Sequence, residues 1–221
     1  MEIDVPWMVD HLDELVARTI QHMYLTAIAV GVGFIISLGL AILAVRRRRT
    51  YGPILAFSSI LYTIPSLALF AALISITGIS LLTVEIPLVM YTLVIFVHNI
   101  VTGIDTVPPD VLEAADGLGY TGRQRLWRVE LPLAVPLIVS GLRLACVSTI
   151  GLVTITSTIG DAFGGLGFFI LEGYRRGFPT EIFFGAIPSI LLAIAFDLLL
   201  LRVQRRATPW NRATGDVVVA G

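Results

Sequence analysis

The sequence predicts an all-α integral membrane protein with five transmembrane helices. Hydrophobic residues make up 56% of the 221-residue chain and charged residues only 14%, whereas a soluble domain carries about 25% charged residues. The mean hydropathy is +0.89. Five apolar runs each reach the roughly 20 residues that a helix needs to cross a membrane. Transmembrane β-strands would be about 10 residues long with alternating polarity, so helices are the predicted spanning elements.

The five runs are interrupted by few polar residues. They cover residues 23–45, 54–77, 81–102, 133–158 and 182–201. Pro65 lies inside the second run, Glu85 near the start of the third and Arg143 inside the fourth, while Asp197 lies near the end of the fifth. Each run is nevertheless apolar enough to be predicted as one spanning helix.

The segments that flank the runs are predicted to lie outside the membrane. Residues 1–22 carry apolar side chains at positions 12, 15, 16 and 20, a spacing that predicts a short amphipathic helix on the outer surface. The transmembrane core, with the polar loop that it contains, is then predicted over 23–206. Residues 207–221 are predicted to be a disordered cytoplasmic tail.

The distribution of arginine predicts the orientation of the helices. All fifteen basic residues are arginines. Eleven of them follow the first run, lie between the third and fourth, or follow the fifth, whereas three lie on the opposite side and one is inside a run. Because positive residues are enriched in cytoplasmic loops, the N-terminus is predicted outside and the C-terminus in the cytoplasm.

The composition also argues against several function classes. Without lysine, the chain has no phosphate-binding loop of the G-x-x-x-x-G-K-[ST] type, so it is not itself a P-loop ATPase. One cysteine and three histidines without ligand spacing predict no metal site. Glu85 and Asp197 are expected at opposite faces of the membrane, and no nucleophile stands beside a base. We therefore expect no enzyme active site, no bound cofactor and no nucleic-acid partner.

A polar loop, residues 105–131, separates the third and fourth runs on the predicted cytoplasmic side. Two prolines at 108 and 109 end the preceding helix, and Asp110 is expected to cap a short helix over 111–118. Gly119 is expected to end this helix in a left-handed turn. The loop is thus predicted to begin with a compact helix and not with a flexible linker.

A second short helix is expected over 123–129, capped by Thr121. Pro132 then restarts the chain into the fourth run. We expect the small side chains of Ala114 and Ala115 to face outward, so that the two helices form a rigid knob. Such a knob can fill a groove on a soluble partner and transmit its motion.

This loop resembles the EAA motif of ABC importer permeases. That motif is E-A-A, three residues, glycine, nine residues, a branched apolar residue, any residue and L-P; the chain matches it with Glu113, Ala114, Ala115, Gly119, Val129, Leu131 and Pro132. Asp116 and Gly117 lie within the same segment. The resemblance implies a coupling helix that docks onto a separate ATP-hydrolysing subunit.

A further resemblance narrows the family. Residues 62–68 read YTIPSLA, which is similar to a segment of permeases for osmoprotectants such as glycine betaine, choline and carnitine, and the likeness extends over about residues 20–206. It implies the type I ABC importer permease fold in a bacterial inner membrane. Its function would be to couple ATP hydrolysis by a partner subunit to alternating access of the transport path.

The resemblance also implies partners. These are two ATP-binding cassette subunits, which would carry the ATP and magnesium, a second permease (another copy or a homologue), an extracytoplasmic substrate-binding protein and the surrounding membrane lipid. Two alternative functions stay open. Permeases for methionine or another small solute share the five spans and the motif, and a structural or secretion-channel subunit would explain the spans but not the motif.

Several polar or aromatic residues within the runs are candidates for a translocation path or gate. They are Tyr62, Pro65, Ser66, Tyr91, Asn99, Arg143 and Asp197. Tyrosine faces attract quaternary ammonium groups through cation–π interactions. Arg143 and Asp197 are both expected in the cytoplasmic half, where they can form an ion pair, whereas Glu85 is expected to be a solvated carboxylate near the outer end of the third run.

Overall fold

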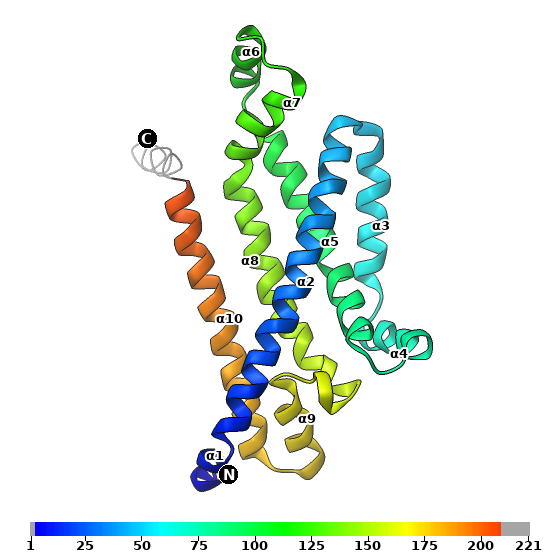
Figure 1. The fold of residues 1–221 in the computed structure, drawn as a ribbon, viewed down its shortest axis with the longest axis vertical. Coiled ribbons are helices and arrows are strands. Elements are labelled where there is room, and N and C mark those ends of the chain that lie inside the picture. The colour runs from blue at the N-terminus through cyan, green and yellow to red at the C-terminus, as the bar shows by residue number, and fades with distance from the viewer. Residues whose placement is uncertain (1–2, 209–221) are drawn as a thin grey trace, which may run out of the picture.

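The chain folds into a bundle of long helices (Figure 1). The computed structural model describes residues 3–208, and every regular element in that range is helical. The elements are α1 (Val5–Asp10), α2 (Leu12–Arg46), η1 (Arg48–Thr50), α3 (Tyr51–Thr63), α4 (Ser66–Thr77), α5 (Leu81–Asp105), α6 (Pro109–Gly117), α7 (Gly122–Arg125), η2 (Leu126–Glu130), α8 (Leu131–Ile155), η3 (Thr156–Thr158), η4 (Asp161–Phe163), α9 (Gly167–Arg176) and α10 (Pro179–Ala207). Among the described residues, four helices are long and apolar enough to cross a membrane, and the number rises to five if the bent pair α3–α4 counts as one span. The predicted all-α membrane fold is confirmed.

Helix α5 is the central element and packs against α2, α3, α4 and α8. Small residues permit this close packing. A Cβ atom on Gly33 of α2 would lie 1.9 Å from Oγ1 of Thr92, and one on Gly141 of α8 would lie 2.7 Å from Cβ of Asn99. Because lipid tails are as apolar as the side chains, helices in a membrane associate through close packing of this kind.

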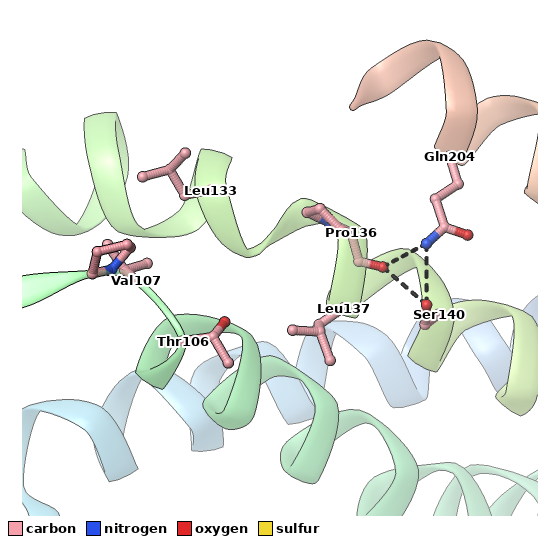
Figure 2. Close-up of a pocket in the computed structure, with 8 residues that line it drawn as sticks. Thr106, Val107, Leu133, Pro136, Leu137, Ser140 and Gln204 are labelled. Atoms are coloured by element: carbon pink, nitrogen blue, oxygen red, sulfur yellow. Dashed lines mark hydrogen bonds between the residues drawn. The ribbon is translucent and has the colours of Figure 1, made fainter. Parts of the chain in front are cut away.

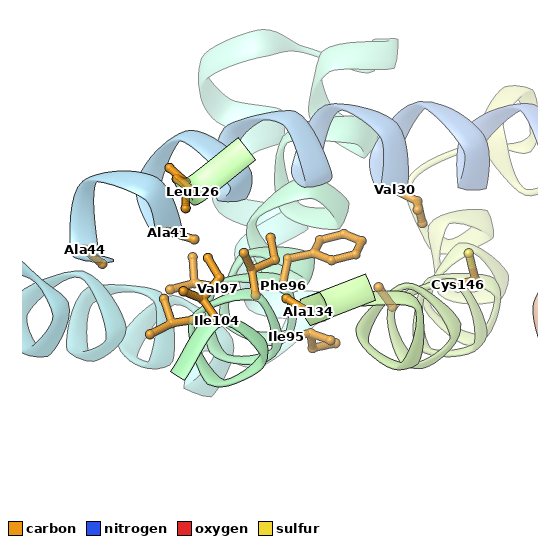
Figure 3. Packing of buried hydrophobic residues seen from close by; sticks show 13 residues of the cluster. Val30, Ala41, Ala44, Ile95, Phe96, Val97, Ile104, Leu126, Ala134 and Cys146 are labelled. Carbon is orange, nitrogen blue, oxygen red and sulfur yellow. The ribbon is translucent and has the colours of Figure 1, made fainter. Parts of the chain in front are cut away.

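The largest hydrophobic cluster joins α5 to its neighbours (Figure 3). Phe96 and Ile104 of α5 meet Ala41 of α2 and Ala134 of α8 in this cluster, and all four side chains are buried. Leu126, from the short helix η2 in the polar loop, is only 3% exposed and belongs to the same cluster. The loop is therefore anchored in the core of the bundle.

The second predicted span is not one straight helix. It is divided into α3 and α4, whose axes differ by 91°. Pro65 has no N–H to donate, and its ring forces the preceding Ile64 into an extended conformation with ψ of 127°. The hydroxyl of Tyr91 in α5 donates a hydrogen bond to the Ile64 carbonyl, which satisfies a group that the broken helix leaves free.

The prediction of a separate short helix within residues 1–22 is wrong about where that helix ends. The apolar residues at 12, 15, 16 and 20 form the first turns of α2, which continues through residue 22 to Arg46 without a break. The chain instead changes direction at His11, the residue between α1 and α2. No glycine or proline lies between His11 and residue 23, so nothing in the sequence stops the helix there. The predicted tail, 207–221, lies outside the described residues except for its first two positions.

The start of α2 is tied to the segment that precedes α9. His22 donates through Nε2 to the Ile150 carbonyl at 3.0 Å and accepts the Leu166 N–H at Nδ1 at 3.3 Å. Gly165, with a φ of 49°, allows this approach because a Cβ there would lie 2.9 Å from Nδ1 of His22. The glycine-rich stretch at residues 164–167 thus forms a turn. It leads into α9, a helix that the sequence analysis did not predict.

The two ends of the bundle carry different elements (Figure 1). Helices α1 and α9 lie at one end, and α6, α7 and the last turns of α10 lie at the other. Arg48, which follows α2, pairs with Asp105 at the end of α5, with Nη1 2.7 Å from Oδ2. The described members of all three arginine groups that were assigned to one side of the membrane therefore belong to the end that carries α6, whereas Arg212 lies outside the described residues.

Candidate functional site

The loop that resembles the EAA motif forms a helix with well-defined ends. Helix α6 begins at Pro109, and Pro108 occupies the N-cap position, so Asp110 lies in the first turn and is not the cap that the sequence predicted. Proline is favoured at the first helical position because its missing N–H would have no partner there. At the other end, Gly119 has a φ of 79°, as predicted. The Tyr120 N–H then donates to the Ala115 carbonyl at 3.1 Å.

The second short helix has the predicted cap but different bounds, since α7 covers Gly122–Arg125 instead of 123–129. Thr121 caps α7: its Oγ1 accepts the Gln124 N–H at 3.3 Å, and Oε1 of Gln124 accepts the Thr121 N–H at 2.8 Å. The chain continues into η2, a π-helix in which the Leu131 N–H donates to the Leu126 carbonyl five residues back. Pro132 cannot donate to a carbonyl four residues back, which favours this widened turn at the base of α8.

Arg125 joins the three parts of the loop. Its Nη1 lies 2.6 Å from Oδ2 of Asp116 in α6, and its Nε lies 2.8 Å from Oε1 of Glu130 at the start of α8. The Glu130 side chain is only 8% exposed, so it depends on this cation for its charge compensation. One guanidinium group therefore links α6 to Glu130, the residue directly before α8, in addition to the backbone connection.

The motif residues divide between the surface and the interior. Four motif-segment residues are exposed on α6, namely Glu113, Ala114, Asp116 and Gly117. Gly119 is exposed in the turn that follows the helix. Ala115 is only 4% exposed, so the prediction that it faces outward is wrong. It lies one helical position beyond Ala114 and is thereby turned by about 100° toward the rest of the molecule. Leu131 is half-buried and Pro132 is exposed where the loop joins α8.

Four of the candidate path residues line one cavity, here named the tyrosine cavity. Tyr62, Pro65, Ser66 and Tyr91 surround a space of about 470 Å³ at the break between α3 and α4. The rings of Tyr62 and Tyr91 meet edge to face with centroids 5.7 Å apart. The remaining wall comes partly from α8, through Ser148, Gly151 and Leu152. Sequence reasoning missed these three, although their i, i+3, i+4 spacing is that of one helix face.

The other candidates for the path lie elsewhere. Nε of Arg143 is 2.8 Å from Oδ1 of Asp197 and its Nη2 is 2.9 Å from Oδ2, so the pair is bidentate. Asn99 donates to the Ile95 carbonyl at 2.8 Å and packs against Gly141. The sequence prediction of an ion pair between α8 and α10 is thus confirmed in geometry, but these residues do not line the tyrosine cavity.

A polar network extends from the ion pair to a second cavity, of about 500 Å³ (Figure 2). Gln204 of α10 accepts from Arg143 at 3.4 Å and donates to the Pro136 carbonyl at 2.9 Å and to Oγ of Ser140 at 3.1 Å. Figure 2 shows Gln204 reaching from α10 to the side of α8. The network fixes the spacing of α8 and α10 near the end that carries α6.

Glu85 is not the solvated carboxylate that the sequence predicted. It is 6% exposed, and within residues 3–208 neither carboxylate oxygen has a hydrogen-bond partner. The prediction failed because the start of α5 is covered by neighbouring helices instead of lying at the surface. Val84 and Leu88, which flank it in α5, belong to a buried cluster with Phe70 of α4.

Comparison with known proteins assigns the family. Residues 19–212 match the family described as "Binding-protein-dependent transport system inner membrane component". The chain belongs to this family. It is accordingly a multi-pass membrane permease of an ABC importer, and membership implies an ATP-hydrolysing subunit and a substrate-binding protein as partners.

Several relatives of this permease have named transport systems. It is 39% identical to the "Osmoprotectant import permease protein OsmW" of Salmonella typhimurium (strain LT2) over 210 residues, which cover 93% of this chain and 97% of the relative. It is 36% identical to the "Glycine betaine/carnitine/choline transport system permease protein OpuCB" of Bacillus subtilis (strain 168) over 196 residues, or 89% of each chain.

Solved structures give the same fold for the permease. A chain of an inward-facing crystal form of the MetNI methionine ABC transporter superposes with a TM-score of 0.78, covering 93% of this chain and 100% of that chain at 20% identity. An amino acid ABC transporter crystallised with histidines gives a TM-score of 0.73 at 21% identity. The type I importer fold implied by the EAA motif is therefore confirmed.

Proposed function

We propose that this permease is the transmembrane subunit of an ATP-driven importer for osmoprotectants of the glycine betaine, choline and carnitine class. The observation that carries the proposal is the position of residues 62–68. This segment, which resembles osmoprotectant permeases, supplies much of the wall of the tyrosine cavity. The two relatives described above, at 39% and 36% identity, are named as an osmoprotectant permease and as a glycine betaine/carnitine/choline permease.

The chemistry of the cavity suits a quaternary ammonium group. A trimethylammonium cation has no N–H to donate, so aromatic faces are the groups that recognise it. Tyr62 and Tyr91 present such faces, and among the described residues no charged side chain lines this cavity. A weakly attractive surface of this kind lets the substrate pass without being retained, and selection is left to the substrate-binding protein.

The exposed α6 is the proposed contact with the ATPase. Two ATP-binding cassette subunits would bind ATP and magnesium, and this chain would bind neither. A pair of permeases, either two copies or this chain with a homologue, would enclose the path. The N-terminal end would face outward and the end with α6 would face the cytoplasm, as the arginine distribution predicts.

Uptake by proteoliposomes tests the proposal. The permease would be reconstituted with its ATPase and binding protein, and uptake of radiolabelled glycine betaine, choline and carnitine measured with ATP enclosed. ATP-dependent accumulation of at least one of them supports the proposal. Accumulation of methionine alone would instead support the alternative function, a methionine permease, whose fold the MetNI structure shares. Accumulation of neither would contradict both assignments and leave another small solute as the substrate of this permease.

A further inference from the structure

A cavity of about 490 Å³ lies between the end of α2 and the start of the helix that leads into α8. It is lined by Val45, Arg46, Gly122, Arg123, Arg125, Leu126 and Glu130. Three of these side chains are cationic and one is anionic. The coupling helix α6 contributes no lining residue, so this cavity is separate from the surface proposed to contact the ATPase.

The three arginines in the cavity differ in whether they have a carboxylate partner. Arg125 is paired with both Asp116 and Glu130, and these contacts neutralise it. Within residues 3–208, Arg46 and Arg123 form no ion pair or hydrogen bond with another side chain, and both are exposed. The one carboxylate in the wall, Glu130, is already engaged by Arg125. Two free guanidinium groups from different elements therefore face one space.

The position of the cavity indicates the kind of anion. Arg46 is the last residue of α2, a helix of spanning length, and Val45 and Leu126 give the cavity an apolar floor. Trp127, next to Leu126, is 51% exposed, as expected for an indole at a membrane–water boundary. Arginine clusters directly beyond the cytoplasmic end of a membrane helix attract anionic lipid headgroups.

We propose that Arg46 and Arg123 form a binding site for the phosphate of an anionic phospholipid headgroup. The phosphate oxygens accept hydrogen bonds from both guanidinium groups. The acyl chains extend along the apolar side of α2. A lipid bound there joins the end of α2 to α7 and so to the base of α8. This assignment rests on the proposed orientation, in which the end that carries α6 faces the cytoplasm, and not on the transported substrate.

Native mass spectrometry of the assembled transporter tests this site. The purified complex, containing this permease and its ATPase, is titrated with dioleoylphosphatidylglycerol. In the test variant Arg46→Gln/Arg123→Gln, we expect the affinity for the bound lipid to fall roughly 30-fold, as the loss of two interfacial cations predicts. The matched control is Arg202→Gln/Arg206→Gln, which removes two exposed arginines of α10 at the same end of the bundle. The control is expected to bind as the wild type does.

Several outcomes would overturn the assignment. Unchanged binding in the test variant would exclude the site, and equal losses in both variants would indicate diffuse surface charge. If millimolar inorganic phosphate displaced the lipid, the cavity would be a site for free phosphate and not for a headgroup. If dioleoylphosphatidylcholine bound as tightly as the anionic lipid, apolar contacts and not the two arginines would be responsible.

Discussion

At the scale of single residues, Arg125 connects the coupling loop to the bundle. Its two carboxylate partners lie in α6 and at the start of α8, and the buried one, Glu130, has no other cation within hydrogen-bond distance in the described part of the chain. Removing the guanidinium would leave a buried carboxylate unpaired, which costs about 1–3 kcal/mol. The ion pairs thus hold α6 to the base of α8, and we propose that they also transmit motion between them.

Arg125→Ala is expected to uncouple the transporter. We expect transport per ATP hydrolysed to fall roughly tenfold. A loss of about 1.4 kcal/mol of interaction energy between Arg125 and its carboxylate partners corresponds to that factor. Uptake and ATPase activity measured on the same proteoliposomes give this ratio. Arg128→Ala, which removes an exposed arginine three positions along, is the control and should keep the wild-type ratio. Equal ratios in Arg125→Ala and the wild type would contradict the role given to this ion pair.

Tyr62 offers a second residue-scale prediction. In Tyr62→Leu the cation–π attraction is lost, so uptake of choline at saturating loaded binding protein should fall roughly three- to tenfold. Tyr62→Phe keeps the aromatic face and should retain most of the rate. If the phenylalanine and leucine variants transported choline equally well, the ring at this position would have no part in substrate passage.

At the scale of elements, much of the architecture follows from local sequence. Apolar runs predicted the long helices, Thr121 predicted the cap of α7, and Gly119 predicted the turn that ends α6. Pro65 lies inside an apolar run that predicts one spanning helix, and the sequence does not show that the chain turns there by 91°. A proline within a helix can either kink or end it, and the outcome here depends on Tyr91 binding the freed carbonyl.

Other features depend on tertiary neighbours and could not be read from the sequence. Burial of Glu85 and Ala115 is decided by which helices pack against them. The tyrosine cavity combines residues of α3, α5 and α8, which are far apart in the chain. Helix α9 is only ten residues long and begins in a glycine-rich stretch, so its local signal is weak. The sites carried by one continuous motif were therefore predicted better than those assembled from several helices.

The turn at Gly119 provides an element-scale prediction. Its φ of 79° lies in the left-handed region, so Gly119→Ala should destabilise the end of α6 by about 1 kcal/mol. Gly117→Ala is the matched control, because Gly117 lies within α6 with open space around it. That substitution should leave transport unchanged or slightly stabilise the helix. Limited proteolysis of the loop, together with uptake, distinguishes Gly119→Ala from Gly117→Ala. Equal protease sensitivity of the two variants would argue against strain at Gly119.

At the scale of the whole molecule, the bundle joins two functional ends through its central helices. The tyrosine cavity lies where α3, α5 and α8 meet, and the same α5 and α8 lead to either side of the loop that holds α6. The loop is anchored in the core by Leu126 and Glu130. If α6 contacts the ATPase as proposed, its movement would be transmitted to α5 and α8, the two helices that join this loop to the tyrosine cavity.

The most direct test of this account is ATP-dependent uptake of glycine betaine by proteoliposomes that contain Glu113→Lys. The substitution reverses the charge of an exposed motif residue on α6 and should abolish uptake and stimulated ATPase activity, with normal insertion into the membrane. Asp110→Lys reverses the charge of another exposed acid of the same helix outside the motif and should still transport. Wild-type uptake by Glu113→Lys would contradict the assignment of α6 as the coupling helix.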